Sequence, residues 1–204
     1  MYEKGRIILA KQNSVIIDPG HGGSDPGAVY GNRREKDDTL ALAYDIGNAL
    51  EQRGIRVEYT RIGDIYNSPY EKAEIGNRSA ADLFLSIHRN AMPVPGTGSG
   101  TMSLIFGRGG DAETFARNIN KELAKTGWKD LGISERPNLV VLRDTALPAV
   151  LVEVGFIDNE NDNDFFDANM RQTADAIADG IVRTFAEQEK QTSDVEEIIV
   201  VLII

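Results

Sequence analysis

The chain of 204 residues contains no cysteine, which excludes disulfides and thiolate metal sites. It also lacks any apolar run near the roughly 20 residues that a membrane-spanning helix needs, so we expect no membrane span. Lys and Arg are few, 22 against 32 Asp and Glu, which gives a formal net charge of −10. Because phosphate binding depends on clustered Lys and Arg, we expect no nucleic-acid partner. Repeats and low-complexity tracts are absent, and the length fits one domain with a substantial core.

Neither end of the chain carries a recognisable targeting signal. The apolar run 7–10 is too short for a signal-peptide core, so we assign 1–13 to an N-terminal extension. Export then uses another route, or a leader is missing from the sequence. Residues 191–204 resemble a linker followed by an apolar tail over 198–204, which is too short to cross a bilayer. We expect either the truncated start of a following segment or a strand or partner contact of its own.

Apolar runs of strand length alternate with amphipathic stretches of helical period, which predicts an α/β domain with a mainly parallel sheet. We expect strands over 15–18, 55–60, 82–88, 101–106, 139–142 and 149–154. Helices are expected over about 37–53, 69–81, 111–125 and 170–189. Ser68, Pro69 and Glu71 supply a cap, a first-turn proline and a capping-box partner for the second helix. The loop 93–100 is rich in Pro, Gly, Thr and Ser.

Histidine occurs only twice, and both copies lie where a predicted strand ends. His21 stands in the glycine-rich run DPGHGG after the first strand, and His88 closes the apolar run 83–88. Glu153 lies near the end of another buried strand, and Glu35 lies in the turn that leads into the first predicted helix. Because functional sites in open parallel sheets form at the carboxyl ends of the strands, we expect these side chains to converge.

Two histidines and one carboxylate suit a catalytic zinc ion with a fourth position left for water. Glu153 remains as a general base, because an ionised glutamate in an apolar strand is costly unless it is paired or functional. Each residue alone has an ordinary explanation: a tight turn for His21, a hydrogen-bonded core position for His88, a solvated helix start for Glu35. Glu153 alone would fit a pair with a buried arginine. Together these explanations require four coincidences, so the metal site is favoured.

Four motifs then resemble one known family. They are IDPGHGG at 17–23, EKD at 35–37, SIHRNA at 86–91 and VEVGFIDN at 152–159. In this order they resemble the zinc-dependent N-acetylmuramoyl-L-alanine amidases of type 3, the group of bacterial autolysins, sporulation enzymes and phage endolysins. The resemblance runs from about residue 14 to 188, so we assign 14–190 to the catalytic domain and 191–204 to the linker or following segment.

The resemblance implies that one zinc ion is held by His21, Glu35 and His88, with Glu153 as the catalytic glutamate. It implies a twisted sheet of about six strands with helices on both faces. The substrate would be peptidoglycan, cleaved at the amide between the lactyl group of N-acetylmuramic acid and L-alanine of the stem peptide. Zinc-activated water would attack, with Glu153 taking its proton and passing it to the departing nitrogen. The enzyme would then act on the cell wall.

Substrate contacts are less sharply indicated. Arg143 suits a stem-peptide carboxylate, because Arg pairs well with such groups, and Asn90 suits a hydrogen bond to the substrate. A structural role is an equal alternative for both. Arg89 follows His88 where many family members carry a small residue, which suggests an altered groove or substrate preference.

Two other functions stay open. A zinc peptidase or carboxypeptidase of similar fold would use the same metal chemistry on wall peptides. An inactive wall-binding module would lack at least one of the four key residues, and all four are present. We expect a monomer, and because an acidic domain is poorly suited to bind an anionic wall unaided, a separate C-terminal wall-targeting module beyond residue 190.

Overall fold

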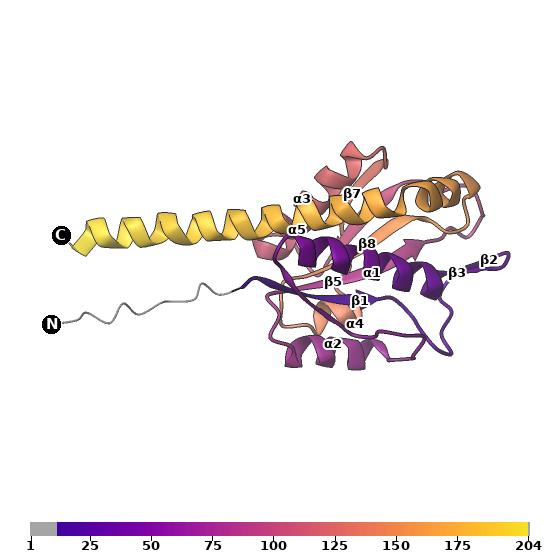
Figure 1. The fold of residues 1–204 in the computed structure, drawn as a ribbon, viewed down its shortest axis with the longest axis horizontal. Coiled ribbons are helices and arrows are strands. Elements are labelled where there is room, and N and C mark those ends of the chain that lie inside the picture. Colours follow the sequence, from indigo (N-terminus) through magenta and orange to yellow (C-terminus); the bar gives the residue numbers. More distant parts are fainter. Residues whose placement is uncertain (1–11, 204) are drawn as a thin grey trace.

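The computed structural model describes the backbone of residues 12–203 and side chains through residue 194. A six-stranded sheet forms the centre, with strand order β4-β1-β5-β8-β6-β7 (Figure 1). In that order the strands are Arg56–Tyr59, Ser14–Pro19, Leu83–Asn90, Ala149–Phe156, Thr101–Ile105 and Asp130–Glu135. The first four strands are mutually parallel. Strand β6 runs antiparallel to β8, and β7 runs parallel to β6. The predicted six-stranded, mainly parallel sheet is confirmed.

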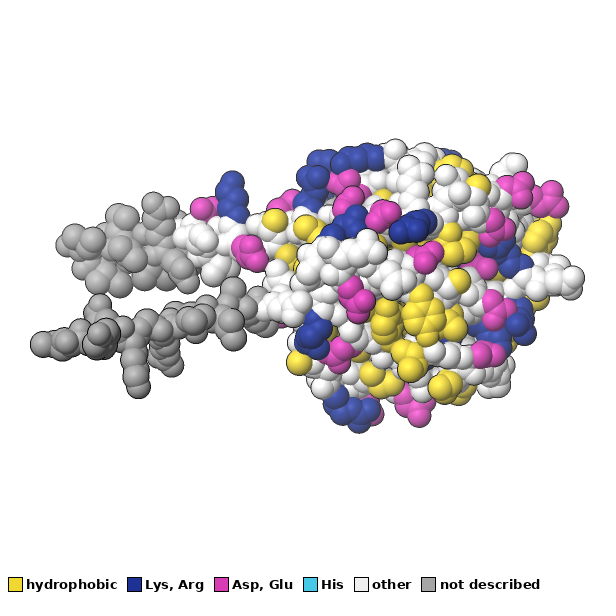
Figure 2. Space-filling view, viewed as in Figure 1, with side chains coloured by type: hydrophobic (Ala, Val, Ile, Leu, Met, Phe, Trp, Pro, Cys, Tyr) yellow, Lys and Arg dark blue, Asp and Glu magenta, His cyan; other side chains and the backbone are white. Residues whose placement is uncertain are grey.

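Helices cover both faces of the sheet, as predicted. One face is covered by α1 (Glu35–Gln52), α3 (Gly110–Lys125) and α5 (Glu160–Ile203), which enclose the larger apolar core. The other face is covered by α2 (Pro69–Arg78) and the short α4 (Val140–Arg143) over a smaller core. Figure 1 shows the two groups of helices on opposite sides of the strands. Charges of both signs are interspersed over the face in Figure 2, where no histidine is visible.

The alternation of side chains along the central strands positions the site. In β5, Leu85 and Ile87 enter the core below α1 and α5, whereas His88 points to the face of α2 and α4. His88 pairs in register with Glu153 of β8, so their side chains share that face. Both residues lie near the carboxyl ends of parallel strands, where sites form in open sheets.

The predicted capping box of α2 is present. The Ser68 hydroxyl accepts a hydrogen bond from the Glu71 amide at 3.3 Å, and the Glu71 carboxylate accepts one from the Ser68 amide at 2.7 Å. These reciprocal bonds satisfy two amides that the first turn leaves unpaired. They fix the start of the helix that carries Lys72 beside the site.

Four elements differ from the sequence prediction. Residues 139–142, expected as a strand, instead contribute to the helical turn α4, which buries Val141 and Leu142 against the smaller core. Tertiary packing here overrides the strand preference of adjacent valines. The edge strand β7 and a small hairpin, β2 (Val29–Tyr30) with β3 (Arg33–Arg34), were not predicted.

The last helix is longer than predicted. It begins at Glu160, departs from helical geometry at Asn169 and continues to Ile203, through residues expected to form a linker. No proline or glycine follows Gly180 to stop it. Its final turns extend past the rest of the fold in Figure 1. No helix in the described chain is both long and apolar enough to span a membrane. The N-terminal residues 1–11 and the side chains of the apolar tail lie outside the described residues.

Candidate metal and catalytic site

His21 follows β1 in a strained backbone conformation. Its φ of +60° is a region that residues other than glycine rarely adopt. The ring is held from behind, because its Nδ1 lies 2.8 Å from a carboxylate oxygen of Asp25. Its Nε2 therefore faces the cluster, and Asp25 fixes the orientation of the imidazole, as carboxylates that hydrogen-bond a ligating histidine do in metal sites.

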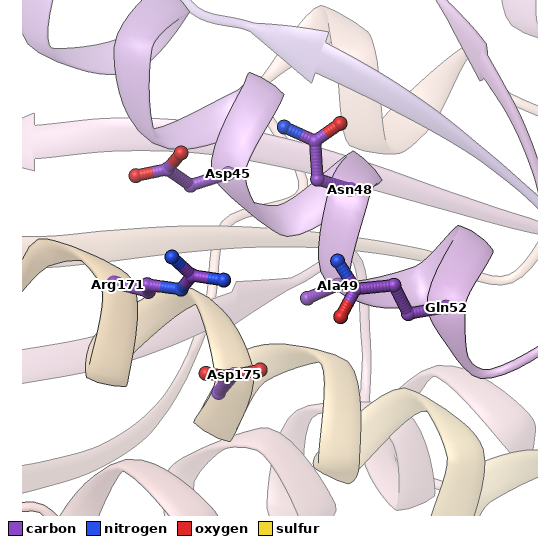
Figure 3. Close-up of a pocket in the computed structure, with 6 residues that line it drawn as sticks. All are labelled: Asp45, Asn48, Ala49, Gln52, Arg171 and Asp175. Carbon is purple, nitrogen blue, oxygen red and sulfur yellow. The ribbon is translucent and has the colours of Figure 1, made fainter.

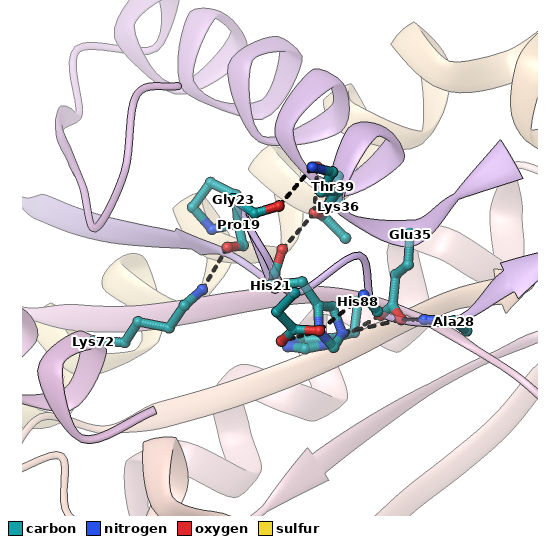
Figure 4. A network of polar contacts seen from close by, with 12 residues as sticks. Pro19, His21, Gly23, Ala28, Glu35, Lys36, Thr39, Lys72 and His88 are labelled. Carbon is teal, nitrogen blue, oxygen red and sulfur yellow. Dashed lines mark hydrogen bonds and ion pairs between the residues drawn. The ribbon is translucent and has the colours of Figure 1, made fainter. Parts of the chain in front are cut away.

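Glu35 is the first residue of α1, and its carboxylate contacts both histidines (Figure 4). Its Oε2 is 3.0 Å from His21 Nε2, and its Oε1 is 2.9 Å from His88 Nδ1. Burial raises the pKa of Glu35, but its contacts with His21 and His88 outweigh burial and hold that pKa well below its usual range. The side chain is therefore an ionised carboxylate at neutral pH.

The structure brings the three predicted ligands together. One ligand atom from each of His21, Glu35 and His88 lies within 4.8 Å of the others, a group that could hold a metal ion. Glycines make this approach possible. A Cβ on Gly20 would lie 2.5 Å from the His88 ring, and one on Gly27 would lie 2.6 Å from both His21 and Glu35. The two Asp-Pro-Gly segments thus leave room for the ligands, which explains their glycines physically.

Glu153 lies beside this group without belonging to it. Its Oε2 is buried and has no hydrogen-bond partner among the described residues. Burial raises the pKa of Glu153 to about 7, with His88 opposing this rise and the Glu35 carboxylate adding to it. A carboxyl with a pKa near the working pH is suited to exchange protons with a reacting group.

A pocket of about 250 Å³ opens next to the two histidines, between the sheet, α2 and α4. Its walls are mainly apolar, with Pro69, Val141 and Leu151 among its lining residues. One charged pair also lines it: Lys72 Nζ lies 2.8 Å from an oxygen of the fully buried Asp18. The same ammonium donates to the Pro19 carbonyl at 2.7 Å, a bond drawn in Figure 4.

The Asp18–Lys72 pair predicts a pH dependence of stability. Burial raises the pKa of Asp18, but Lys72 and hydrogen bonds from Thr60 and Ser86 outweigh burial, so the pKa lies below its ordinary value. A carboxyl of this kind stabilises the fold above its unfolded-state pKa, about 3.9, and loses that contribution as the pH falls. Asp18→Asn should therefore be less stable than wild type at neutral pH.

This stability deficit should shrink as the pH falls below about 3.9. Chemical denaturation of the metal-free proteins on both sides of that pH measures it. Asp111→Asn, at an exposed position on α3, is the control and should show no such convergence. A deficit for Asp18→Asn that stays constant into acid would contradict the expectation.

The two predicted substrate contacts, Arg143 and Asn90, are not among the residues that line the pocket. Arg143, at the end of α4, makes two bonds of 2.7 and 2.9 Å with the Asp144 carboxylate. The Asn90 amide donates to Met102 Sδ at 3.5 Å, and its carbonyl oxygen accepts from the Ala91 amide.

Arg89 does not reach the groove, contrary to the expectation from sequence. Arg89 directly follows His88 on the strand, and successive side chains on a strand point to opposite faces of the sheet, so the Arg89 side chain points away from the face that carries His88. There it is buried, pairs with Asp38 at 2.6 Å and lies over the Phe166 ring at 4.1 Å. Its backbone amide, however, donates to Glu35 Oε1 at 2.9 Å and so helps to orient that carboxylate.

A second pocket, of about 160 Å³, lies between α1 and α5 on the other side of the sheet (Figure 3). Arg171 of α5 points toward α1 there, near Asp45. None of the predicted site residues lines this pocket. The chemistry is therefore concentrated at the carboxyl edge, where the first pocket adjoins the histidines.

Sequence reasoning missed several residues that support the site, among them Asp25, Lys72 and Arg61. Asp25 left a usable signal, because it opens a second Asp-Pro-Gly triplet four residues after His21. No sequence pattern indicates Lys72 or Arg61, since their partners include backbone carbonyls from segments distant in sequence.

The fold and cluster define a single-domain α/β protein with a candidate metal site of two histidines and one carboxylate at the carboxyl edge of its sheet. A family model described as N-acetylmuramoyl-L-alanine amidase matches residues 15–183. The chain therefore belongs to the N-acetylmuramoyl-L-alanine amidase family. This membership confirms the predicted function as a peptidoglycan amidase.

Individual relatives agree with this assignment. An N-acetylmuramoyl-L-alanine amidase of Bacillus licheniformis is 37% identical over 177 residues, covering 84% of this chain and 68% of that protein. A germination-specific N-acetylmuramoyl-L-alanine amidase of Bacillus subtilis is 31% identical over 191 residues, covering 85% of this chain and 80% of that protein. The crystal structure of an N-acetylmuramoyl-L-alanine amidase from Clostridium difficile 630 has a TM-score of 0.82 and 32% identity, covering 87% of this chain and 98% of that one.

Proposed function

We propose that the chain is a zinc-dependent amidase in which His21, Glu35 and His88 hold one zinc ion. The observation that carries this is the convergence of two imidazoles and an ionised carboxylate, from three separate segments, to within 4.8 Å. The donor set fits, because two histidines and one carboxylate make up a common catalytic zinc site that keeps a position for water. The glycines at 20 and 27 leave the space that such an approach requires.

A zinc ion bound there would supply Lewis-acid polarisation and lower the pKa of a water molecule. Glu153 is the proposed general base. Its buried Oε2 has no hydrogen-bond partner in the described chain, so it is available to take a proton from water. Because its pKa is about 7, the same carboxyl can return that proton to the departing alanine nitrogen.

The pocket beside the histidines is the proposed place for substrate next to the scissile amide. Its apolar walls suit the methyl-bearing lactyl and alanine groups on either side of that bond.

Arg143 remains the proposed partner of a stem-peptide carboxylate, since residues of α4 line the pocket and Arg143 ends that helix. Asn90, which extends β5 two residues past His88, remains a proposed hydrogen-bond donor to substrate. Arg143→Ala and Asn90→Ala should each raise KM for wall fragments; unchanged KM values would reject the respective role.

Digestion of purified peptidoglycan tests the activity and its metal dependence. We expect the protein to release stem peptides with an N-terminal alanine, leaving a free lactyl group on the glycan. A chelator should abolish this release, and added zinc should restore it. Product masses decide the reaction: cleavage within the stem peptide would indicate a peptidase instead, and cleavage that persists without metal would reject the zinc proposal.

We further propose that the chain works as a monomer, because the three proposed zinc ligands and the proposed general base all lie within one copy of the chain. Sedimentation velocity of the active protein would show a single species of 22.3 kDa. An active dimer with an inactive monomer would contradict this.

A further inference from the structure

Arg61, two residues past the end of β4, is a buried cation whose hydrogen-bond partners are uncharged. The residue is 3% exposed. Its guanidinium donates to four backbone carbonyls, those of Pro19 at 3.1 Å, Gly20 at 2.9 Å, Lys36 at 2.9 Å and Gly63 at 2.8 Å. Burying a charge is costly unless its partners compensate. The position therefore calls for an explanation beyond filling space.

The carbonyls it holds adjoin two of the three predicted ligands. Gly20 directly precedes His21, and Lys36 directly follows Glu35. One nitrogen, Nη2, bonds both carbonyls at 2.9 Å and so ties the histidine loop to the first turn of α1. A planar guanidinium presents several donors in a fixed arrangement, which a flexible ammonium cannot reproduce.

Other side chains also hold this loop. Lys72 donates to the Pro19 carbonyl at 2.7 Å. The Thr39 hydroxyl lies 2.9 Å from the Gly20 oxygen and 3.2 Å from the Lys36 oxygen, but it has a single proton to donate, whereas the guanidinium has several N–H donors. Of these three side chains, Arg61 is the one that bonds the carbonyls of Pro19, Gly20 and Lys36 together. The strained φ of His21 needs such support, because a residue persists in that region only when its surroundings over-determine it.

We propose that Arg61 is a positioning residue for the metal site, fixing the His21 loop against the start of α1 so that the His21 and Glu35 ligand atoms meet. The inference rests on the proposed zinc site. It concerns the affinity for the ion, which can be measured apart from turnover.

The test compares zinc dissociation constants, measured by competition with a chromogenic chelator, for wild type, Arg61→Met, Arg61→Lys and Arg53→Met. Far-UV circular dichroism establishes that each protein is folded. Arg53 is the control, because it too holds one segment to another by several hydrogen bonds, to the Ala49 carbonyl and to the Asp175 and Asp179 carboxylates, on the opposite side of the sheet from the site pocket. Loss of a group that orients metal ligands typically weakens metal binding about ten- to hundredfold, and we expect this for Arg61→Met. Arg61→Lys should lie between it and wild type.

The outcomes separate cleanly. A folded Arg61→Met with wild-type zinc affinity would overturn the inference, and so would an equal loss in Arg53→Met, which would indicate general destabilisation. If Arg61→Met does not fold, Arg61→Lys decides: weaker binding supports the inference and unchanged binding overturns it. Failure of the wild-type protein to bind zinc would instead reject the proposed metal site.

Discussion

Replacing Glu153 with glutamine is expected to lower turnover by about 10²- to 10⁴-fold, the usual contribution of a general acid–base group, while the fold remains intact. Glutamine keeps the size of the side chain but cannot take a proton from water. The loss should appear in kcat, because Glu153 is not one of the three grouped ligands. Turnover of peptidoglycan fragments, followed by the release of N-terminal alanine, measures it.

Metal content distinguishes this role from that of a ligand. Glu153→Gln should retain the wild-type zinc content by elemental analysis. Glu74→Gln, at an exposed position on α2, supplies a control that should behave as wild type. Wall lysis by Glu153→Gln at the wild-type rate would reject the assignment, and loss of zinc from this variant would make Glu153 a ligand.

The chemistry of the site was largely predictable from sequence because its residues follow simple local patterns. His88 ends one apolar run of strand length and Glu153 lies near the end of another, and such strands form a parallel sheet whose carboxyl ends share one edge. His21 stands in a glycine-rich turn where only a few residue types fit. Glu35 was less clearly marked, since its charged surroundings alone indicate a solvated helix start, and it was assigned as a ligand through its combination with the two histidines, which the family resemblance then supported.

The parts that sequence did not predict depend on tertiary contacts. The four-residue α4 is too short to form by itself and exists only because Val141 and Leu142 pack under the sheet. The edge strand β7 alternates weakly, contains Gly132 and pairs with β6 alone. Arg61 bonds backbone carbonyls, which carry no side-chain signature, so no pattern of residue types could identify it.

Replacing either histidine with alanine is expected to remove the metal and, with it, all measurable activity. His21 and His88 are the only imidazoles in the chain, so no other histidine can take over. Removing a ligand should weaken zinc binding by more than the roughly ten- to hundredfold loss that follows when a group orienting a ligand is removed. Elemental analysis after dialysis and chelator competition both measure this, and circular dichroism establishes that the variants are folded.

Asp25→Asn provides a comparison variant in which zinc affinity should fall less than in the two histidine variants. Asp25 lies 2.8 Å from the Nδ1 of His21 and should orient that ring without binding the ion. We therefore expect Asp25→Asn to weaken zinc binding by about ten- to hundredfold and to keep partial activity at saturating zinc. His21→Ala should stay inactive at any zinc concentration. If His21→Ala and His88→Ala bound zinc as tightly as wild type, the ion would lie elsewhere, and the contacts of Glu35 with both rings would be structural only.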